Sequence, residues 1–294
     1  MKSILVMMST YNGELYLNQL LDSVFLQKDV EINMLVRDDG STDRTMAILD
    51  DYSKRYNLKY YTGKNLKPAK SFMDLINKAD EYDYYAFCDQ DDFWIDDKMI
   101  TCLNAIDDSN TPMLCYCKMD VVNENLEHQD TYFRNGNYSS SLKYSTFFGS
   151  EIPGCTMVFN HALMNYLKMY NPSYISMHDA WAHKVCLVVG GKVLGVMEPL
   201  IKYRIHSHNV VGMKKRNFID RIKKFFNKEH NYSSLTKELL SGYSNFMSDD
   251  SKIFLNKFSH YSRNFFTLSF TRFEFKIGIK ERMKMIIKML LRVY

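Results

Sequence analysis

The chain lacks any long uninterrupted hydrophobic run, although 46% of its 294 residues are hydrophobic. A membrane-spanning helix needs about 18 or more consecutive apolar residues, and charged residues interrupt every apolar stretch well before that length. The first apolar run, residues 3–9, is not followed by a small-residue cleavage site, so we interpret it as a buried strand and not as a signal peptide. These absences predict a cytoplasmic protein with a substantial core.

Two kinds of motif are also missing. None of the six cysteines forms a C-x-x-C pair, and most lie in apolar segments. We therefore expect buried thiols in a reducing compartment, and neither a disulfide framework nor a zinc site. Near the N-terminus the sequence reads STYNGE and not a glycine-rich basic phosphate loop. This argues against a nucleotidyltransferase.

Positive charge is scarce in the first part of the chain and abundant in the last. Residues 1–212 hold 20 Lys and Arg against 27 Asp and Glu, and residues 213–294 hold 18 against 7. The net charges of −7 and +11 return the total of +4. We therefore predict two modules, residues 1–212 and residues 213–294, the second basic and helical.

The basic module contains two amphipathic stretches, residues 214–230 and 279–294, with apolar side chains at helical spacing. Three uses stay open for them: packing on the first module, peripheral contact with an anionic membrane surface at the inner face of the cell membrane, or self-association into a homodimer. No nucleic-acid-binding motif accompanies the charge, so we do not expect nucleic acid as a partner.

Strand-like and helix-like stretches alternate through the first two fifths of the chain. We predict strands at residues 3–9, 31–39, 58–63 and 82–89, and helices at residues 13–27, 40–56 and 69–79. Ser41 is a plausible N-cap of the second helix. This order predicts an α/β fold with a mostly parallel central sheet and helices on both faces. Such sheets bind ligands beyond the carboxyl ends of their strands.

Polar clusters follow three of these strands: STYNG at residues 9–13, RDDGSTD at 37–43 and DQDD at 89–92. All three would lie along one rim of the sheet. The last cluster contains Asp89, Asp91 and Asp92, which repel one another unless a positive charge lies between them. We interpret it as a divalent-cation site, the alternative being a solvated acidic turn.

The second half of the chain offers further candidates. His206 and His208 lie in a polar loop after a predicted strand and are candidate metal ligands. Asp179 precedes Trp181 at the start of a predicted helix. It is either a helix N-cap or a general base that the tryptophan shields from water.

Six motifs occur in order: STYNG, DDGSTD, DQDD, IPGCTMVFN, HDAW and YRIHSHNVVG. In this the chain resembles bacterial glycosyltransferase family 2, an inverting family with the GT-A fold, over roughly residues 1–212. DQDD, HD-x-W and YR-x-H-x-x-N look most like rhamnosyltransferases that build surface polysaccharides. The resemblance implies a nucleotide-sugar donor, which is either dTDP-rhamnose or a UDP-hexose. It also implies a saccharide acceptor, which one interpretation places on a lipid, and a divalent cation, Mg²⁺ or Mn²⁺.

The resemblance also assigns roles to individual residues. Asp179 matches the catalytic base, and Asp91, His206 and Asp89 match the metal site. This intact set argues against a catalytically inactive, lectin-like relative. The nucleotide-sugar-binding positions are Thr10, Tyr11, Asn12, Asp38, Asp39, Asn65, Lys70, Asp89, Gly154, Cys155 and Trp181.

One segment departs from the family pattern. The family often has a glycine-containing N-x-G loop after the third strand, and this chain reads KNLKPAKSF there. Lys67 or Pro68 takes the place of the glycine.

Overall fold

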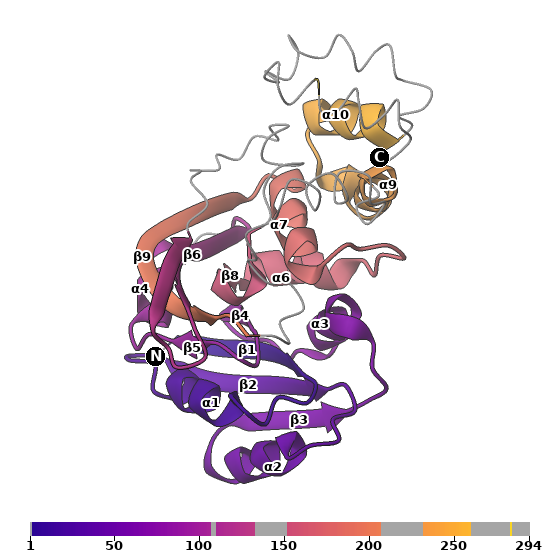
Figure 1. Ribbon diagram of the computed structural model, residues 1–294. Coiled ribbons are helices and arrows are strands. Elements are labelled where there is room, and N and C mark those ends of the chain that lie inside the picture. Colours follow the sequence, from indigo (N-terminus) through magenta and orange to yellow (C-terminus); the bar gives the residue numbers. More distant parts are fainter. Residues whose placement is uncertain (1, 107–109, 133–151, 207–231, 260–282, 284–294) are drawn as a thin grey trace.

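The computed structural model describes residues 2–106, 110–132, 152–206, 232–259 and residue 283. Strands and helices alternate around one sheet (Figure 1). The strands are β1 (Ser3–Thr10), β2 (Glu31–Asp38), β3 (Leu58–Thr62), β4 (Tyr84–Cys88), β5 (Phe93–Trp94), β6 (Met113–Val122), β7 (His128–Tyr132), β8 (Met157–Asn160) and β9 (Lys192–Arg204). The helices are α1 (Leu17–Phe25), α2 (Thr45–Arg55), α3 (Lys67–Lys78), α4 (Lys98–Ala105), α6 (His161–Met169), α7 (His178–Val188), α9 (Tyr232–Tyr243) and α10 (Asp249–Ser259), with short 3-10 turns η1 (Gly154–Thr156) and η2 (Ser244–Phe246).

The sheet has the strand order β3-β2-β1-β4-β8-β6-β9-β5, and β7 pairs with β6. The first four strands are parallel, as predicted. The second half is mixed, because β8 runs antiparallel to both β4 and β6, whereas β9 runs parallel to β6. Because the strand direction reverses from β4 to β8 and again from β8 to β6, β6 and β9 run in the same direction as the first four strands. The carboxyl end of β9 therefore returns to the rim where β1, β2 and β4 end.

Each face of the sheet is covered by its own hydrophobic core. Alternate residues of β1 enter different cores, since side chains along a strand point to opposite faces. Ile4 and Val6 pack with α1, α2 and α4, whereas Leu5 and Met7 pack with α3, α6 and α7. The predicted layers of helices on both faces are confirmed.

The N-terminus of α2 differs from the expectation. The helix begins at Thr45, and the Ser41 hydroxyl donates a hydrogen bond to Asp38 and so does not cap the helix. The backbone N–H of Thr45 is instead bound by the Asp43 carboxylate, at 2.9 Å. Residues 39–44 are therefore a loop at the sheet rim between β2 and α2.

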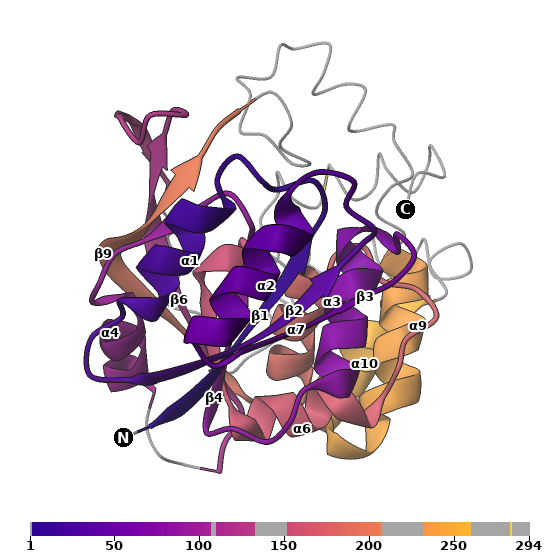
Figure 2. The same cartoon turned by 90° about the horizontal axis from the view of Figure 1, so that it is seen from below.

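The described part of the C-terminal region shares a core with the sheet. Leu239 and Tyr243 of α9 are fully buried in the same cluster as residues of α3, α6 and α7. In Figures 1 and 2, α9 lies beside α7 and α10 packs against α9, on the side of the molecule away from α1 and α4. The predicted boundary at residue 212, His208 and the stretch 214–230 lie outside the described residues, as does all of 279–294 except residue 283. Among the described helices, none combines the length and apolarity that a membrane crossing requires.

Candidate active site

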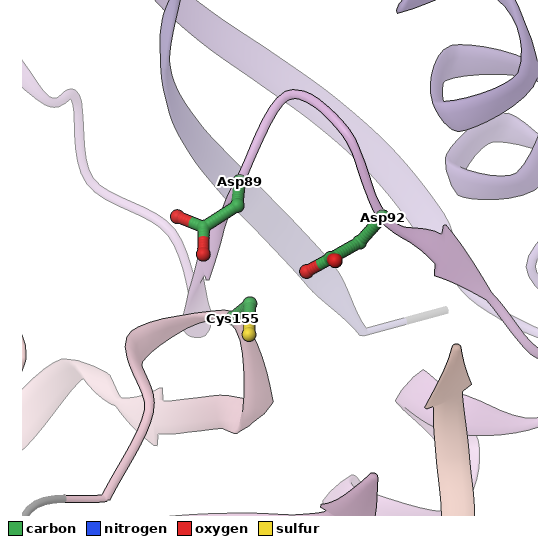
Figure 3. Close-up of side chains that lie close together, drawn as sticks. All are labelled: Asp89, Asp92 and Cys155. Atoms are coloured by element: carbon green, nitrogen blue, oxygen red, sulfur yellow. The ribbon is translucent and has the colours of Figure 1, made fainter. Parts of the chain in front are cut away.

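The DQDD segment leaves the end of β4 and turns beneath η1. Ligand atoms of Asp89, Asp92 and Cys155 all lie within 4.8 Å of one another (Figure 3). Asp92 and Cys155 have no exposed surface. The sequence placed Asp92 in the predicted cation cluster, but the family resemblance gave individual metal roles only to Asp91, His206 and Asp89. No sequence pattern indicates the burial of Asp92.

Burial makes the charge of this cluster costly. It is the main cause that raises the pKa of Asp89 from 3.8 to about 7, with further contributions from the charges of Asp91 and Asp179. Burial, followed by the charges of Asp91 and Asp89, also raises the pKa of Asp92 well above its usual range. Without a cation, the cluster retains protons at a pH where exposed carboxyl groups have lost them.

Two buried cations accompany the carboxylates. The Lys98 ammonium donates to the carbonyl oxygen of Cys155 at 2.7 Å, and its side chain is fully buried. Arg204, at the end of β9, donates its backbone N–H to Asp92 at 3.2 Å and its Nε to the Asp91 carbonyl oxygen at 2.9 Å. Sequence analysis identified neither residue. Lys98 lies outside every motif, 6 residues after DQDD and 54 residues before IPGCTMVFN, and Arg204 stands inside the YRIH motif without an assigned role.

The structure brings together the two predicted metal ligands that are far apart in sequence. His206 Nε2 lies 2.7 Å from Asp91 Oδ2. The His206 ring also contacts Tyr16, with 5.1 Å between the ring centroids. This placement follows from the return of β9 to the rim. The Arg204 bond to the Asp91 backbone fixes the two segments at that point.

A divalent cation fits the charges and the donor atoms. Asp89, Asp91, Asp92 and Asp179 supply four negative charges when ionised, and Lys98 and Arg204 supply two positive charges, which leaves −2. Asp92 Oδ2 is buried and has no hydrogen-bond partner among the described residues. Carboxylate oxygens suit Mg²⁺ and Mn²⁺. Burial raises the pKa of the Cys155 thiol, so the soft thiolate that zinc prefers is disfavoured.

Asp179 lies in the first turn of α7 and is not its N-cap, which is Met177. Its carboxylate accepts the backbone N–H of Gly154 at 3.1 Å and that of Ala180 at 2.6 Å. A Cβ on residue 154 would lie 2.7 Å from His178 Nε2 and 3.3 Å from the Asp179 Cβ, so only glycine fits this close approach. Gly154 thus connects η1, which carries Cys155, to the candidate base.

His178, next to Asp179, is a buried residue that sequence reasoning missed. Its ring stacks on Phe72, with 3.7 Å between centroids, and meets Phe87 edge-on at 4.8 Å. Burial lowers its pKa to about 3, and neither ring nitrogen has a hydrogen-bond partner among the described residues. His178 is therefore a neutral aromatic ring that packs the first turn of α7 against α3 and β4.

The rim loops after β1 and β2 are tied to each other. Thr10 donates to Asp38 at 2.9 Å, and Asp38 also accepts the backbone N–H groups of Gly40 and Ser41. Asn12 accepts the backbone N–H of Thr42 at 2.8 Å. The predicted nucleotide-binding residues Thr10, Asn12 and Asp38 are thereby assembled at one place.

Gln90 links these loops to the acidic cluster. Its amide accepts the backbone N–H of Tyr11 at 2.9 Å and donates to the Tyr11 carbonyl oxygen at 3.1 Å. A side chain on Gly13 would collide with it, at 2.6 Å from Gln90 Oε1. The Tyr11 side chain itself is half exposed at the rim. The second residue of DQDD therefore positions the STYNG loop.

Asp39 is held beneath the loop that precedes α3. It pairs with Arg37 and accepts hydrogen bonds from Ser71 and from the backbone of Leu66, at 2.6 and 3.1 Å. Asn65 caps the backbone N–H of Lys67 at 3.0 Å.

The same loop explains how the chain departs from the family pattern. Lys67 has φ +68°, the left-handed conformation that favours glycine, so the lysine keeps the backbone shape of the missing glycine. Asn65 and Lys70 are both exposed beside this loop.

The expectation that Trp181 shields the site is not supported by its contacts. The Trp181 side chain is 1% exposed, and its ring neighbours are Tyr170 at 6.4 Å and Tyr243 at 6.0 Å between centroids. These contacts give the ring a packing role between α7 and α9.

The fold and the site define a nucleotide-sugar glycosyltransferase with the GT-A fold. The model of the family described as Glycosyl transferase family 2 matches residues 5–167, more than half of the chain. The chain belongs to this family.

Individual relatives agree with that assignment. The dTDP-rhamnosyl transferase RfbG of Shigella flexneri is 29% identical over 223 residues, which cover 70% of this chain and 73% of that protein. The structure of Staphylococcus aureus TarS 1–349 in complex with UDP-GlcNAc matches with a TM-score of 0.59 and 20% identity, over 98% of this chain and 79% of that one. The mannosyltransferase PcManGT of Pyrobaculum calidifontis, in complex with GDP-Man and Mn²⁺, gives a TM-score of 0.50 and 12% identity, over 83% and 64%.

The raised pKa of Asp89 predicts a pH-dependent stability without metal. Between pH 3.8 and about 7 the folded protein keeps a proton on Asp89 that the unfolded chain releases, so stability falls as pH rises through this range. The slope from one group is at most about 1.4 kcal/mol per pH unit. In EDTA, the stability of Asp89→Asn relative to wild type should therefore increase from pH 4.5 to 7, and the difference between the two proteins should stay constant above that. Urea unfolding at several pH values measures it, and parallel curves for the two proteins would contradict the assignment.

Proposed function

We propose that the protein is a metal-dependent, inverting rhamnosyltransferase that moves rhamnose from dTDP-rhamnose to a saccharide acceptor in the synthesis of a cell-surface polysaccharide. The observation that carries the proposal is the meeting, at one rim, of the nucleotide-binding loops, the Asp91–His206 pair and the Asp179 carboxylate. The likeness to RfbG supports rhamnose as the donor sugar. A UDP-hexose is the alternative donor, supported by the TarS complex with UDP-GlcNAc.

The donor would lie across the linked rim loops. Thr10, Asn12 and Asp38 would bind the nucleoside, with the Tyr11 ring half exposed beside them. Because these loops are fixed by their own hydrogen bonds, little conformational entropy is lost when a nucleotide binds. The diphosphate would then extend toward Asp91.

Asp91, His206 and Asp89, together with Asp92, would hold Mg²⁺ or Mn²⁺. When bound, the cation neutralises the negative charge that develops on the departing diphosphate. The protein residues orient this site: Arg204 fixes the Asp91 backbone, and Tyr16 packs against His206. The Asp92 carboxylate, one oxygen of which has no hydrogen-bond partner among the residues the structure describes, would bring the additional negative charge that favours a divalent ion.

Asp179 would act as the base. Two backbone N–H groups, from Gly154 and Ala180, orient its carboxylate. It accepts the proton of the acceptor hydroxyl as that oxygen attacks the anomeric carbon and the bond to the diphosphate breaks. A single displacement inverts the anomeric configuration, so no nucleophilic side chain is needed.

The first test is release of nucleoside diphosphate from a panel of nucleotide sugars, with Mn²⁺ and with EDTA. We expect turnover of dTDP-rhamnose in Mn²⁺ and its loss in EDTA. Asp91→Ala should lower nucleoside diphosphate affinity in Mn²⁺ to the EDTA level, as measured by calorimetry. Preferential use of a UDP-hexose would select the alternative donor, and equal affinity with and without metal would rule out the cation.

Removal of the candidate base is the second test. Asp179→Asn keeps the shape of the side chain and an acceptor for Gly154, and removes the site of protonation. We expect loss of transfer by 100-fold or more, with donor affinity within about threefold of wild type. The exposed Asp51→Asn is the matched control. A loss of less than tenfold, about 1.4 kcal/mol in the barrier, is too small for the sole base and would leave Asp179 a structural role.

We propose further that the basic C-terminal segment, residues 276–294, contacts an anionic membrane that carries the acceptor. The segment holds six basic residues and one acidic residue. Each basic residue near an anionic bilayer contributes about 1 kcal/mol. The support is the sequence alone, since all of this segment except residue 283 lies outside the described residues.

Liposome sedimentation tests this contact. We expect salt-sensitive binding to anionic vesicles and little binding to neutral ones. Replacing Lys280, Lys284, Lys288 and Arg292 by Gln should abolish binding and leave nucleotide affinity unchanged. If wild type ignores anionic vesicles at low salt, the apolar faces of this segment are assigned to packing or to a homodimer, which sedimentation analysis distinguishes.

A further inference from the structure

Lys98 is a charged residue in an unfavourable position. It has no exposed surface, although burial of an ammonium group is costly without strong partners. It is also the first residue of α4, where the helix dipole disfavours a positive charge. Nothing in the fold of α4 requires a cation here. Its retention must be explained by what surrounds it.

The surroundings of Lys98 belong to the acidic cluster. Its Nζ donates to the Cys155 carbonyl oxygen at 2.7 Å and lies 3.2 Å from the centre of the Trp94 ring. The ammonium has three donors and makes this one hydrogen bond among the described residues. Cys155, whose carbonyl it binds, belongs to the cluster in which the ligand atoms of Asp89, Asp92 and Cys155 lie within 4.8 Å of one another, so the ammonium lies beside these carboxylates. Lys98 therefore compensates negative charge at the cluster from inside the protein.

Arg204 does not duplicate this role. Its guanidinium is bound to the Asp91 carbonyl oxygen, to Gln19 at 2.8 Å and to the carbonyl oxygen of Glu124. Its side-chain bonds thus connect β9 to the rim. In the part of the chain that the structure describes, the Lys98 ammonium contacts the Cys155 carbonyl and the Trp94 ring, and it connects no other segment to the rim.

We propose that Lys98 is the fixed counter-cation of the carboxylate cluster. As a positioning residue, it keeps Asp89 and Asp92 together when no divalent ion is bound. The site still carries excess negative charge, which one such ion would balance. The inference rests on the metal site of the proposed function. It adds that part of the site's charge balance is built into the hydrophobic core. It also predicts that Lys98 and the metal repel each other, although both stabilise the same carboxylates.

Neutral substitutions at residue 98 test this repulsion. Lys98→Gln keeps a donor for the Cys155 carbonyl, whereas Lys98→Met removes it. In EDTA both variants should unfold at lower temperature than wild type. Mn²⁺ should raise their Tm more than it raises that of wild type and should bind about tenfold more tightly at pH 8, because a positive neighbour is gone. Lys28→Gln, at an exposed lysine paired with Asp96 and Asp97, is the control.

If Mn²⁺ raises the Tm of wild type and of Lys98→Gln by the same amount, the inference is overturned and the proposed function stays intact. Absence of any Mn²⁺ effect on wild-type Tm and nucleotide affinity would instead contradict the metal site itself, and the inference with it. The two failures are therefore distinguishable.

Charge compensation offers a second test that a merely structural lysine would fail. Asp92→Asn removes one negative charge and keeps the Oδ1 acceptor for the Arg204 backbone. In EDTA the double variant Lys98→Met, Asp92→Asn should be more stable than Lys98→Met alone. If the losses of stability caused by the two substitutions simply add in the double variant, the inference is overturned. If Lys98→Met fails to fold, folding of the double variant supports it, and failure of both contradicts it.

Discussion

The constraint on which this site depends is the repulsion between carboxylates that have been removed from water. Asp92 is fully buried and Asp89 partly so, and Asp91 adds a third charge within four residues. A fold can tolerate this arrangement only if protons or cations neutralise it. The protein supplies two buried cations, Lys98 and Arg204. Under the proposed function a bound divalent ion would balance the remainder, so affinity for the ion and instability without it would have the same physical origin.

The topology of the sheet supplies the second half of the site. A parallel sheet alone would place only the ends of β1, β2 and β4 at the rim. The antiparallel insertion of β8 between β4 and β6 allows β9 to run toward the same rim, where it delivers Arg204 and His206. The same insertion places η1 next to β8, so that Gly154 meets Asp179. One topological feature therefore completes both the metal side and the base side.

The sequence predicted those parts of the structure that depend on local pattern. Hydrophobic periodicity located the four parallel strands, and the polar residues after them were correctly expected at one rim. Lys98 could not be predicted in this way, because a lysine on a short helix is ordinarily exposed and only the tertiary structure buries it. Trp181 shows the same limit: an aromatic residue beside a candidate base was expected to shield it, and its neighbours come instead from α9, which no local pattern places. The mixed second half of the sheet was missed for this reason too.

Gln90 shows how the separate parts of the site are coupled. Its amide pairs with both backbone polar groups of Tyr11, so the nucleotide-binding loop is bonded to the residue between Asp89 and Asp91. Any shift of the DQDD turn on cation binding must therefore move the STYNG loop, whose neighbour across the rim is Asp38. A side chain at residue 13 would meet the Gln90 amide, so Gly13 leaves room for this contact. Under the proposed function, binding of the cation and binding of the nucleoside would therefore be linked through this hydrogen-bonded connection, in addition to their electrostatic attraction through the diphosphate.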